Sequence, residues 1–488
     1  MTGRLSAATV SALAVPTPRY DRSAVRAGIV HLGVGGFHRA HEALYVDRLL
    51  AAGHTDWGIC GVGTQPSDRR MRDVLRAQDG LYTLVVKHPD TRREMQVVGS
   101  LVDYLFAPDE PEAVVERLAA ETTRIVSLTI TEGGYPVDPL TGGFRPVEPS
   151  LLLDLQPDSR PTTVFGLVTE ALARRRARGL PAFTVLSCDN VPRNGQVCRA
   201  AFSGFADRRD PGLGAWVREH VAFPSSMVDR ITPGTTDEDR VAVSDVLGVT
   251  DEWPVACEGW LQWVLEDTWA DGSPPWGEVG VQLVEDVHPY ELMKLRLLNA
   301  GHQALGYLGY LAGYRTTDEA CSDASFRAFV LGYMEHEATP TLLPVPGVDL
   351  EDYRRSLVER FANPAVRDTL ARLCAESSDR ISTFLLPVVR EQLARGGPVD
   401  RSALVVAAWA RYAEGVDEQG EPIVVVDRLL EPVRAAAARS REDPAAFLAE
   451  LDMFGDLAGS AVFVAAFTRW LQVLRERGAR AAVALATA

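Results

Sequence analysis

The sequence predicts an α/β N-terminal domain, residues 1–285, followed by a mainly α-helical C-terminal domain, residues 286–488. In the first half, short apolar and β-branched runs alternate with longer amphipathic stretches, which is typical of a parallel sheet covered by helices on both faces. Beyond about residue 286, Leu- and Ala-rich stretches such as 356–376 have helical periodicity and almost no strand signal. A chain of 488 residues is long enough for two such domains.

Five apolar runs in the first half are predicted strands, separated by stretches with helical spacing. We expect them in one parallel sheet, because strands buried on both faces read as nearly continuous apolar runs. Ligands of open α/β sheets bind at the edge formed by the carboxyl ends of such strands. The predicted strands are 28–34 (GIVHLGV), 57–63 (WGICGVG), 82–87 (YTLVVK), 124–130 (RIVSLTI) and 183–188 (FTVLSC).

Three glycines, Gly33, Gly35 and Gly36, stand where the first strand passes into the first helix. In a dinucleotide-binding fold such glycines permit a tight turn and let backbone N–H groups approach a pyrophosphate at the helix N-terminus. The third glycine of the usual G-x-G-x-x-G pattern is absent, because position 38 is His. The order of strand, turn and helix still predicts that residues 1–285 form a Rossmann-type dinucleotide-binding domain.

Asp68 follows the second predicted strand and is the candidate to bind the adenosine ribose hydroxyls, which favours NAD as the cofactor. An Asp at this position is also suited to capping the next helix, and the two roles are compatible. Arg69 and Arg70 stand beside it and are able to receive a 2′-phosphate, so NADP stays open as an alternative.

His38 and His41 form an HxxH pair, but no third ligand stands at a suitable spacing, so no metal site is predicted. The six cysteines include no CxxC pair, which indicates neither a zinc site nor a disulfide framework and fits a cytoplasmic protein. A net charge of −16 argues against nucleic acid as a partner. The N-terminal residues make a poor signal peptide and no apolar run is long enough for a membrane span, so we expect no membrane partner.

Lys294 is one of only two lysines among the 50 basic side chains, the other being Lys87. Arginine keeps its proton in proteins, whereas a lysine in a dry pocket is able to act as a base. On an α-helix Glu291, Lys294, Asn299 and His302 would lie within one 140° arc, which would join a base, a carboxylate and two groups that bind an oxygen atom. The alternative is a surface ion pair between Glu291 and Lys294.

Asn190 lies in the segment SCDNVPRNG, residues 187–195, at the carboxyl end of a predicted strand. This is the edge at which ligands bind in open α/β sheets, so Asn190 is a candidate to face the site. Asn residues before turns are also common for purely local reasons, which is the alternative interpretation.

Six segments of the chain occur together as the motifs of one known family: GVGGFHRAH (33–41), ITEGGY (130–135), SCDNVPRNG (187–195), FPSSMVDRITP (223–233), CEGWLQWVLED (257–267) and PYELMKLRLLNAGH (289–302). By these motifs the chain resembles the polyol-specific long-chain dehydrogenases, the mannitol dehydrogenase family, from about residue 28 to the VDEQG segment near residue 420. The resemblance implies NAD(P)-linked, metal-independent interconversion of a secondary alcohol and a ketone.

The resemblance also implies roles for individual residues, which we state as expectations for this chain. Lys294 matches the family's general base, Asn299 and His302 match residues that hold the reactive oxygen, and Asn190 matches a second donor to it. Glu291 matches a residue that exchanges protons between the lysine and water. Expected substrate-binding residues are Asp229, Arg372 and Arg380, and expected cofactor-binding residues are Gly33, Gly35, Gly36, Phe37, Asp68 and Glu132.

The segments ITEGGY and LLPVPGVDLEDY (342–353) resemble the mannitol 2-dehydrogenases of the family most closely. We therefore expect a monomer that oxidises D-mannitol to D-fructose; a fructuronate reductase and an arabinitol dehydrogenase are the alternatives. A carboxylate substrate would favour a bidentate cation, which Arg296, Arg372 or Arg380 could supply. Two departures concern the far end of the substrate: Gly259-Trp260 replaces an expected Pro-Phe, and Arg380 stands where mannitol enzymes commonly carry Lys.

Overall fold

The computed structural model describes residues 3–138, 141–156 and 159–488. The chain divides into two compact units. The first comprises Met1–Lys87 and Arg92–His288, and the second comprises His88–Thr91 and Pro289–Ala488. The predicted fold class is confirmed, because the first unit is α/β and the second is helical. The grouping of His88–Thr91 with the second unit had no signal in the sequence.

A five-stranded parallel sheet forms the centre of the first unit. Its strand order is β5-β2-β1-β6-β7, the doubly wound arrangement in which the third strand of the sheet lies at one edge and the first lies in the middle. The order reverses between β1 and β6, where Val30 lies opposite Val126. Ligands bind beyond the carboxyl ends of the strands at such a switch point. The strands are β1 Ala27–Leu32, β2 Gly58–Gly63, β5 Leu101–Phe106, β6 Ile125–Leu128 and β7 Thr184–Ser187.

The prediction that residues 82–87 belong to this sheet is wrong. They form β3 (Tyr82–Lys87) in a separate sheet, antiparallel to β4 (Arg93–Val98) and parallel to β9 (Val255–Glu258). The missing parallel strand is β5, whose Val102, Asp103 and Leu105 are only partly buried, as expected at a sheet edge. Its apolar run is therefore interrupted, and the continuous-run criterion does not detect it. A third sheet contains β8 (Ser226–Asp229), β10 (Gln262–Glu266) and β11 (Gln282–Val284).

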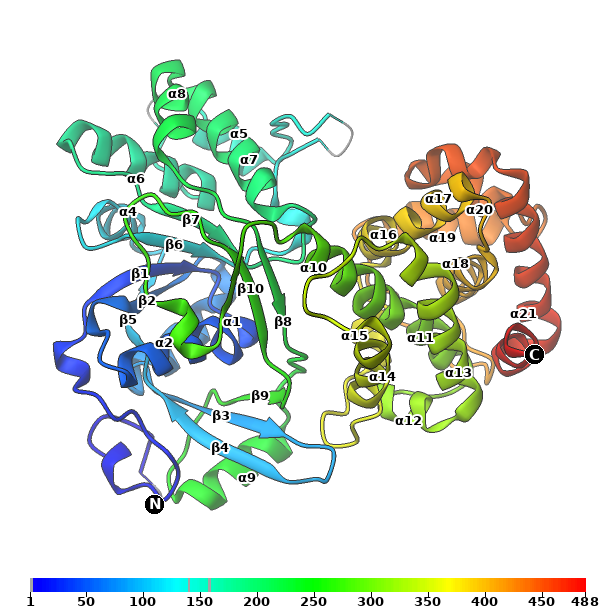
Figure 1. Cartoon of the computed structure of the whole chain (residues 1–488), viewed down its shortest axis with the longest axis horizontal. Coiled ribbons are helices and arrows are strands. Elements are labelled where there is room, and N and C mark those ends of the chain that lie inside the picture. Colours follow the sequence, from blue (N-terminus) through cyan, green and yellow to red (C-terminus); the bar gives the residue numbers. More distant parts are fainter. Residues whose placement is uncertain (1–2, 139–140, 157–158) are drawn as a thin grey trace. The chain divides into compact units, whose positions relative to one another are not determined.

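Helices cover both faces of the parallel sheet (Figure 1). On one face α4, α6 and α7 contribute Val114, Leu172 and Phe202 to a core shared with Val30 and Val126. On the other face α2 contributes Leu44 and Tyr45 to a core shared with Trp263 of the third sheet and with Trp276. The helices of this unit are α1 Gly36–Ala40, α2 Glu42–Ala51, α3 Arg69–Ala77, α4 Pro111–Ala119, α5 Pro149–Asp154, α6 Val164–Arg178, α7 Asn194–Arg209, α8 Pro211–His220 and α9 Asp237–Leu247.

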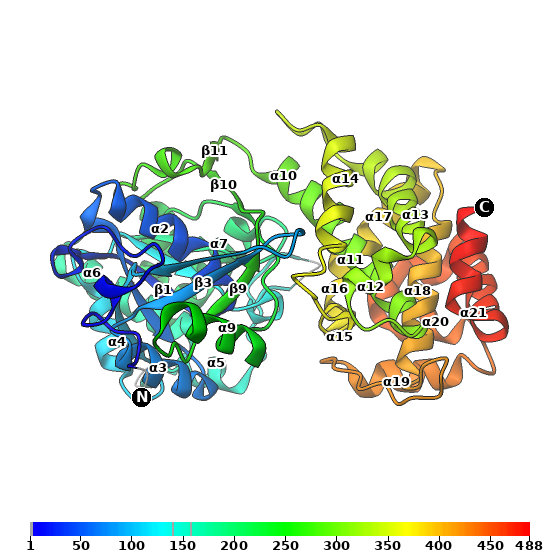
Figure 2. The same ribbon diagram turned by 90° about the horizontal axis from the view of Figure 1, so that it is seen from below.

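The second unit is a helical assembly in which α18 packs against both α11 and α21 (Figure 2). Helix α10, His288–Met293, lies at its start and is followed directly by the Lys294–Asn299 segment. The α-helices that follow are α11 Ala300–Leu311, α12 Thr317–Ser322, α13 Ala324–Tyr333, α14 Leu350–Phe361, α15 Leu370–Leu373, α16 Ser377–Arg380, α17 Leu386–Arg395, α18 Asp400–Ala413, α19 Leu430–Arg439, α20 Ala446–Glu450 and α21 Ala461–Thr487.

Three segments of the second unit are π-helical: Lys294–Asn299, Met334–Ala338 and Ile381–Leu385. In the first, the Ala300 N–H bonds the carbonyl of Leu295, five residues earlier. This segment packs against both of the others. Because π-helical turns are rare and occur often at functional sites, their presence around Lys294 marks this region.

Membrane-span criteria were met by no single helix of the described chain. The bent pair Asp452–Gly459 and Ala461–Thr487 meets the length and composition criteria only when its two parts are taken together.

Candidate active site

The glycine turn after β1 is held between two neighbouring strand ends. Gly33 has a φ of +95°, and a Cβ added there would lie 2.1 Å from the carbonyl oxygen of Thr129. Its N–H donates to the Val62 carbonyl at 3.0 Å, and its own carbonyl accepts the Thr129 hydroxyl at 2.6 Å. Both the backbone conformation and the lack of space require glycine at this position.

Gly35 and Gly36 are less crowded than Gly33. A Cβ added there would meet its nearest neighbouring atom at an ordinary contact distance, 3.8 Å or 3.7 Å. No side chain caps the N-terminus of α1, which begins at Gly36. Phe37 is partly buried, and its ring stacks on His41 with centroids 4.9 Å apart. Because no side chain of the described residues caps this turn, its backbone N–H groups are candidates to bind a pyrophosphate.

Asp68 acts as a local cap in the structure. Its Oδ2 accepts the N–H groups of Thr64 at 3.0 Å and Gln65 at 2.9 Å, at the end of β2. Arg69 donates two hydrogen bonds to Asp109, at 2.8 and 2.9 Å, and Arg70 lies over the Trp253 ring. The expected helix cap is wrong, because the Asp68 side chain makes no capping hydrogen bond to α3 and instead closes the capping box of the 3₁₀ turn Pro66–Asp68. The ribose role stays a prediction.

Two loops that follow β6 and β7 are joined by Asp189. Its carboxylate accepts the N–H groups of Ile130 at 3.1 Å and Thr131 at 2.9 Å, and the Tyr135 hydroxyl at 2.7 Å. Asn190 follows directly and is half-buried at the carboxyl edge of the sheet, where the sequence placed it. Glu132 begins a short 3₁₀ turn in the first loop, and its side chain lies outside the described part of the structure.

Asp229 is the last residue of β8 and is 2% exposed. The strand is fixed beside β7 by Asn194, whose side chain bonds both the carbonyl of Ser226 at 2.8 Å and its N–H at 2.9 Å. Asn190 and Asp229 thus both stand at strand ends of the first unit.

The lysine segment of the second unit is buried. Lys294 is 5% exposed, Glu291 4%, and Asn299 and His302 8% each. The alternative of a surface ion pair is therefore wrong, because neither Glu291 nor Lys294 lies at the surface. A buried polar face must meet hydrogen-bonding partners or a polar cavity.

The π-helical geometry changes the angular positions that a regular α-helix would give. A helix that closes its hydrogen bonds at i+5 has more than about four residues per turn, so each residue advances by less than about 90°. Asn299 then lies less than about 90° from Lys294 around the axis instead of about 140°. The π turn therefore brings these side chains, and His302 beyond them, closer to one line than the sequence periodicity predicted.

His302 is held in its neutral form. Burial and the positive charges of Arg372, Arg360, Arg380 and Lys294 lower the pKa of its imidazole well below the ordinary value. Its ring packs on Phe361, with centroids 4.3 Å apart, and its Nε2 has no hydrogen-bond partner among the described residues. A neutral imidazole among cations is suited to donate a hydrogen bond to an oxygen that gains negative charge.

The candidate substrate arginines already have partners. Arg372 forms a bidentate pair with Asp368, Arg380 donates to the carbonyls of Arg372 and Leu373 at 2.8 and 3.0 Å, and Arg296 pairs with Glu391 at 2.7 Å. Arg360, a fourth cation near His302, was not singled out from the sequence, because its place in the helical run 350–361 is that of an ordinary helix arginine.

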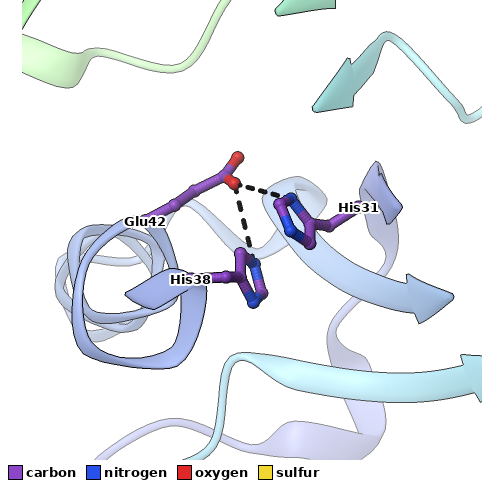
Figure 3. A group of neighbouring side chains, drawn as sticks. All are labelled: His31, His38 and Glu42. Carbon is purple, nitrogen blue, oxygen red and sulfur yellow. Dashed lines mark ion pairs between the residues drawn. The ribbon is translucent and has the colours of Figure 1, made fainter. Parts of the chain in front are cut away.

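His38 lies with His31 and Glu42 and not with His41, whose Nε2 bonds the Gln262 carbonyl at 2.8 Å (Figure 3). Glu42 Oε2 is 3.0 Å from His31 Nδ1 and 3.6 Å from His38 Nε2. Such a trio resembles a metal site, but the two rings are stacked, 3.5 Å apart and inclined by only 14°. Imidazole lone pairs lie in the ring plane, so nearly parallel rings do not both reach one ion at about 2.1 Å. The arrangement therefore does not have the geometry of a metal centre: Glu42 lies close to His31 Nδ1, and His38 stacks on the His31 ring.

Residues 27–278 match the mannitol dehydrogenase Rossmann domain, and residues 286–475 match the mannitol dehydrogenase C-terminal domain. The chain belongs to the mannitol dehydrogenase family. Mannitol 2-dehydrogenase of Phaeosphaeria nodorum is 45% identical over 476 residues, which cover 96% of this chain and 83% of that protein. The enzyme of the same name from Aspergillus fumigatus is 45% identical over 91% of this chain and 89% of its own length.

Two solved structures of the mannitol dehydrogenase family's fold are similar over nearly the whole chain. Pseudomonas fluorescens mannitol 2-dehydrogenase, in a ternary complex with NAD and D-mannitol, has a TM-score of 0.94 and 44% identity over 98% of both chains. D-sorbitol dehydrogenase in substrate-free form has a TM-score of 0.84 and 38% identity, over 99% of this chain and 100% of its own. The predicted family and the predicted enzyme class, a polyol dehydrogenase, are confirmed.

Proposed function

We propose that the protein is an NAD-dependent mannitol 2-dehydrogenase, which oxidises D-mannitol to D-fructose and catalyses the reverse reduction without a metal ion. The observation that carries the proposal is the 44% identity, over 98% of both chains, to the Pseudomonas fluorescens enzyme that binds NAD and D-mannitol. The glycine turn suits the dinucleotide, because its required glycine at position 33 leads into a helix start that no side chain of the described residues caps. The backbone N–H groups at Gly35, Gly36 and Phe37 would receive the pyrophosphate.

The bound NAD supplies a hydride acceptor for the carbinol carbon. We assign Lys294 as the base that takes the proton of the substrate hydroxyl. Asn299 and His302 then donate hydrogen bonds to the oxygen as it gains negative charge, and Asn190 is assigned as a further donor. The neutral state of His302 suits this role, because its N–H donates without adding a titrating charge. Glu291, buried one turn before Lys294, is the proposed route by which the lysine proton reaches water.

A neutral polyol is favoured over a uronate by the arginines. Arg372 and Arg296 each already pair with a carboxylate, and Arg380 donates to two backbone carbonyls. A substrate carboxylate would have to displace Asp368 or Glu391 to gain a bidentate pair. Hydroxyl groups, in contrast, need only single hydrogen bonds, which the remaining N–H groups of Arg372 and Arg380 supply, while Asp229 accepts from a hydroxyl.

NAD is favoured over NADP by the contacts after β2. Arg69 is held by Asp109, and Asp68 follows β2, where an acid commonly binds the adenosine ribose hydroxyls. A 2′-phosphate bound beside Asp68 would be repelled by the negative charge of its carboxylate. Arg69 would not offset this repulsion, because it is already paired with Asp109. We further propose a monomer in a reducing compartment such as the cytoplasm, which all six free cysteines suit.

The test is a set of initial rates with D-mannitol, D-sorbitol and D-arabinitol as reductants of NAD and NADP, and with D-fructose and D-fructuronate as oxidants of NADH. We expect the largest kcat/KM values for D-mannitol with NAD and D-fructose with NADH, unchanged after dialysis against EDTA. A larger kcat/KM for D-sorbitol or D-fructuronate would refute the substrate, and loss of activity after EDTA that added zinc restores would refute the metal-independent reaction.

A further inference from the structure

A buried chain of polar side chains lies directly behind the glycine turn. It runs from Glu42 at the start of α2, through Ser127 on β6 and His31 on β1, to Thr129 at the end of β6. His31 and Ser127 are fully buried, and Glu42 is 1% exposed. Polar groups this deeply buried are costly unless they are hydrogen-bonded, so their hydrogen bonds determine how they are arranged.

The hydrogen bonds of Thr129 show which groups donate and which accept along this row of buried polar side chains. The Thr129 hydroxyl has one hydrogen, and the Gly33 carbonyl, 2.6 Å away, is only able to accept it. The same hydroxyl oxygen is 2.9 Å from His31 Nε2, so it accepts there, and Nε2 must carry a hydrogen. His31 therefore orients the Thr129 hydroxyl toward the carbonyl of the turn glycine.

The other side of His31 holds its tautomer. Nδ1 is 2.8 Å from the Ser127 hydroxyl and 3.0 Å from Glu42 Oε2, and the Ser127 hydroxyl is 2.9 Å from the same carboxylate oxygen. Glu42 and Ser127 thus occupy the Nδ1 side of the ring and leave Nε2 to donate to Thr129.

We propose that His31, held by Glu42 and Ser127, is a positioning residue for dinucleotide binding, acting through Thr129 on the carbonyl of Gly33. The inference rests on the proposed function, because the ligand is NAD. Gly33 is the point at which β1 turns into α1, and the residues that follow it would receive the pyrophosphate. A carbonyl anchored on one side by Thr129, with its own N–H anchored on Val62, fixes the orientation of the next peptide groups.

The test uses two variants of Thr129, the only partly buried member of this row of side chains. Thr129→Val removes the hydroxyl with little change in shape, and Thr129→Ser keeps it. We expect Thr129→Val to raise the Kd for NADH roughly three- to tenfold, the effect of one hydrogen bond, and Thr129→Ser to stay within about twofold of the wild type. The KM for D-mannitol at saturating NAD, and kcat, should change by less than about twofold in both variants.

Thr169→Val is the matched control. Thr169 lies on α6 in the same unit, is 1% exposed, and its hydroxyl has no hydrogen-bond partner among the described residues. This variant should bind NADH as the wild type does, so a general effect of removing a buried threonine hydroxyl is measured separately.

A double-mutant cycle with His31→Leu tests the link to His31. If His31 acts through Thr129, then adding His31→Leu to Thr129→Val should raise the Kd for NADH by less than about twofold more. Additive effects, or a Thr129→Val variant that binds NADH within about twofold of the wild type, would overturn the inference. If His31→Leu fails to fold, comparing Thr129→Val with Thr129→Ser still tests whether the hydrogen bond to the Gly33 carbonyl affects NADH binding. A wild type that does not bind NADH would refute the proposed function instead.

Discussion

At the scale of single residues, the two lysines have different surroundings and, we infer, different roles. Both lysines of the chain are 5% exposed. Lys87 pairs with Asp239 at 2.8 Å. Burial would raise the pKa of Asp239, but the hydrogen bonds from Lys87 and from the Thr236 N–H outweigh it and lower the pKa. Lys87 is thus a structural cation, whereas Lys294 lies on the polar face of Asn299 and His302.

Lys294→Met should lower kcat for mannitol oxidation by roughly 10²- to 10⁴-fold, the usual contribution of a general base, with an unchanged Kd for NADH. Lys87→Met is the matched control from the only other lysine. It should lower Tm, because it leaves Asp239 buried without its partner, but keep kcat within about threefold. Steady-state rates, NADH titration and thermal unfolding provide the three readouts. Retention of more than about a tenth of kcat in Lys294→Met would contradict the role of base.

His302 should act without titrating in the working pH range, because its pKa is depressed well below the ordinary value. His302→Gln, which keeps a donor, should then show a kcat against pH curve of the wild-type shape. His302→Leu, which has no donor, should lose roughly 10²- to 10³-fold in kcat. An ionisation near pH 6 to 7 in the wild-type curve that disappears in His302→Gln would show instead that the imidazole gains or loses a proton during catalysis.

At the scale of elements, a carboxylate from one π-helical segment caps a neighbouring helix. Glu337 is fully buried and accepts the N–H groups of Arg401 at 2.6 Å and Ser402 at 2.8 Å, in the first turn of α18. Helix N-termini favour negative charge, yet burial raises the pKa of Glu337 from 4.5 to about 6. Its ionisation in the folded protein is therefore costly.

The raised pKa of Glu337 should make the free energy of unfolding fall as the pH rises. Between pH 4.5 and about 6 the folded state holds the Glu337 proton and the unfolded state does not, so this contribution is present below pH 4.5 and is lost as pH rises through about 6. The destabilisation caused by Glu337→Gln should accordingly be larger at pH 5 than at pH 7, by about 1 kcal/mol. Urea unfolding at both pH values measures it. An equal or larger destabilisation at pH 7 would show that the carboxylate stabilises as an anion.

At the scale of the whole molecule, the parallel strands that the sequence predicted are those buried on both faces. β1, β2, β6 and β7 have fully buried patterns, and their apolar runs are continuous. The edge strand β5 has an interrupted pattern and was missed. The sequence also could not show which sheet β3 joins, because strand pairing depends on residues far away in the chain.

The candidate site was predicted unevenly for similar physical reasons. Gly33 has a local role in a turn, so its neighbours in the sequence indicated it. The expected cap of α3 by Asp68 is wrong, because its carboxylate bonds the Thr64 and Gln65 N–H groups before the helix. The π turn at Lys294 was missed, because apolar spacing alone does not distinguish it from an α-helix. His31 was read as part of an apolar run, and its partners Ser127 and Glu42 come from other elements.

The charge of the molecule bears on its assembly. A net charge of −16 opposes self-association, since like-charged copies repel one another. Light scattering coupled to size-exclusion chromatography should therefore give the mass of one chain, 53.1 kDa, at micromolar concentration and moderate salt. Twice that mass, independent of dilution, would show that a dimer overcomes the repulsion.

The burial of both lysines has a consequence for covalent labelling. Amine-selective reagents need an accessible, unprotonated ε-amine, and Lys87 and Lys294 each expose only 5% of their surface in the folded protein. Acylation of these two side chains should be slow in the native state and fast once the chain unfolds. Peptide mass spectrometry of the two sites would then report the opening of each unit separately, because Lys87 belongs to the first and Lys294 to the second. The scarcity of lysine thus equips each unit with a single chemical reporter of its own unfolding.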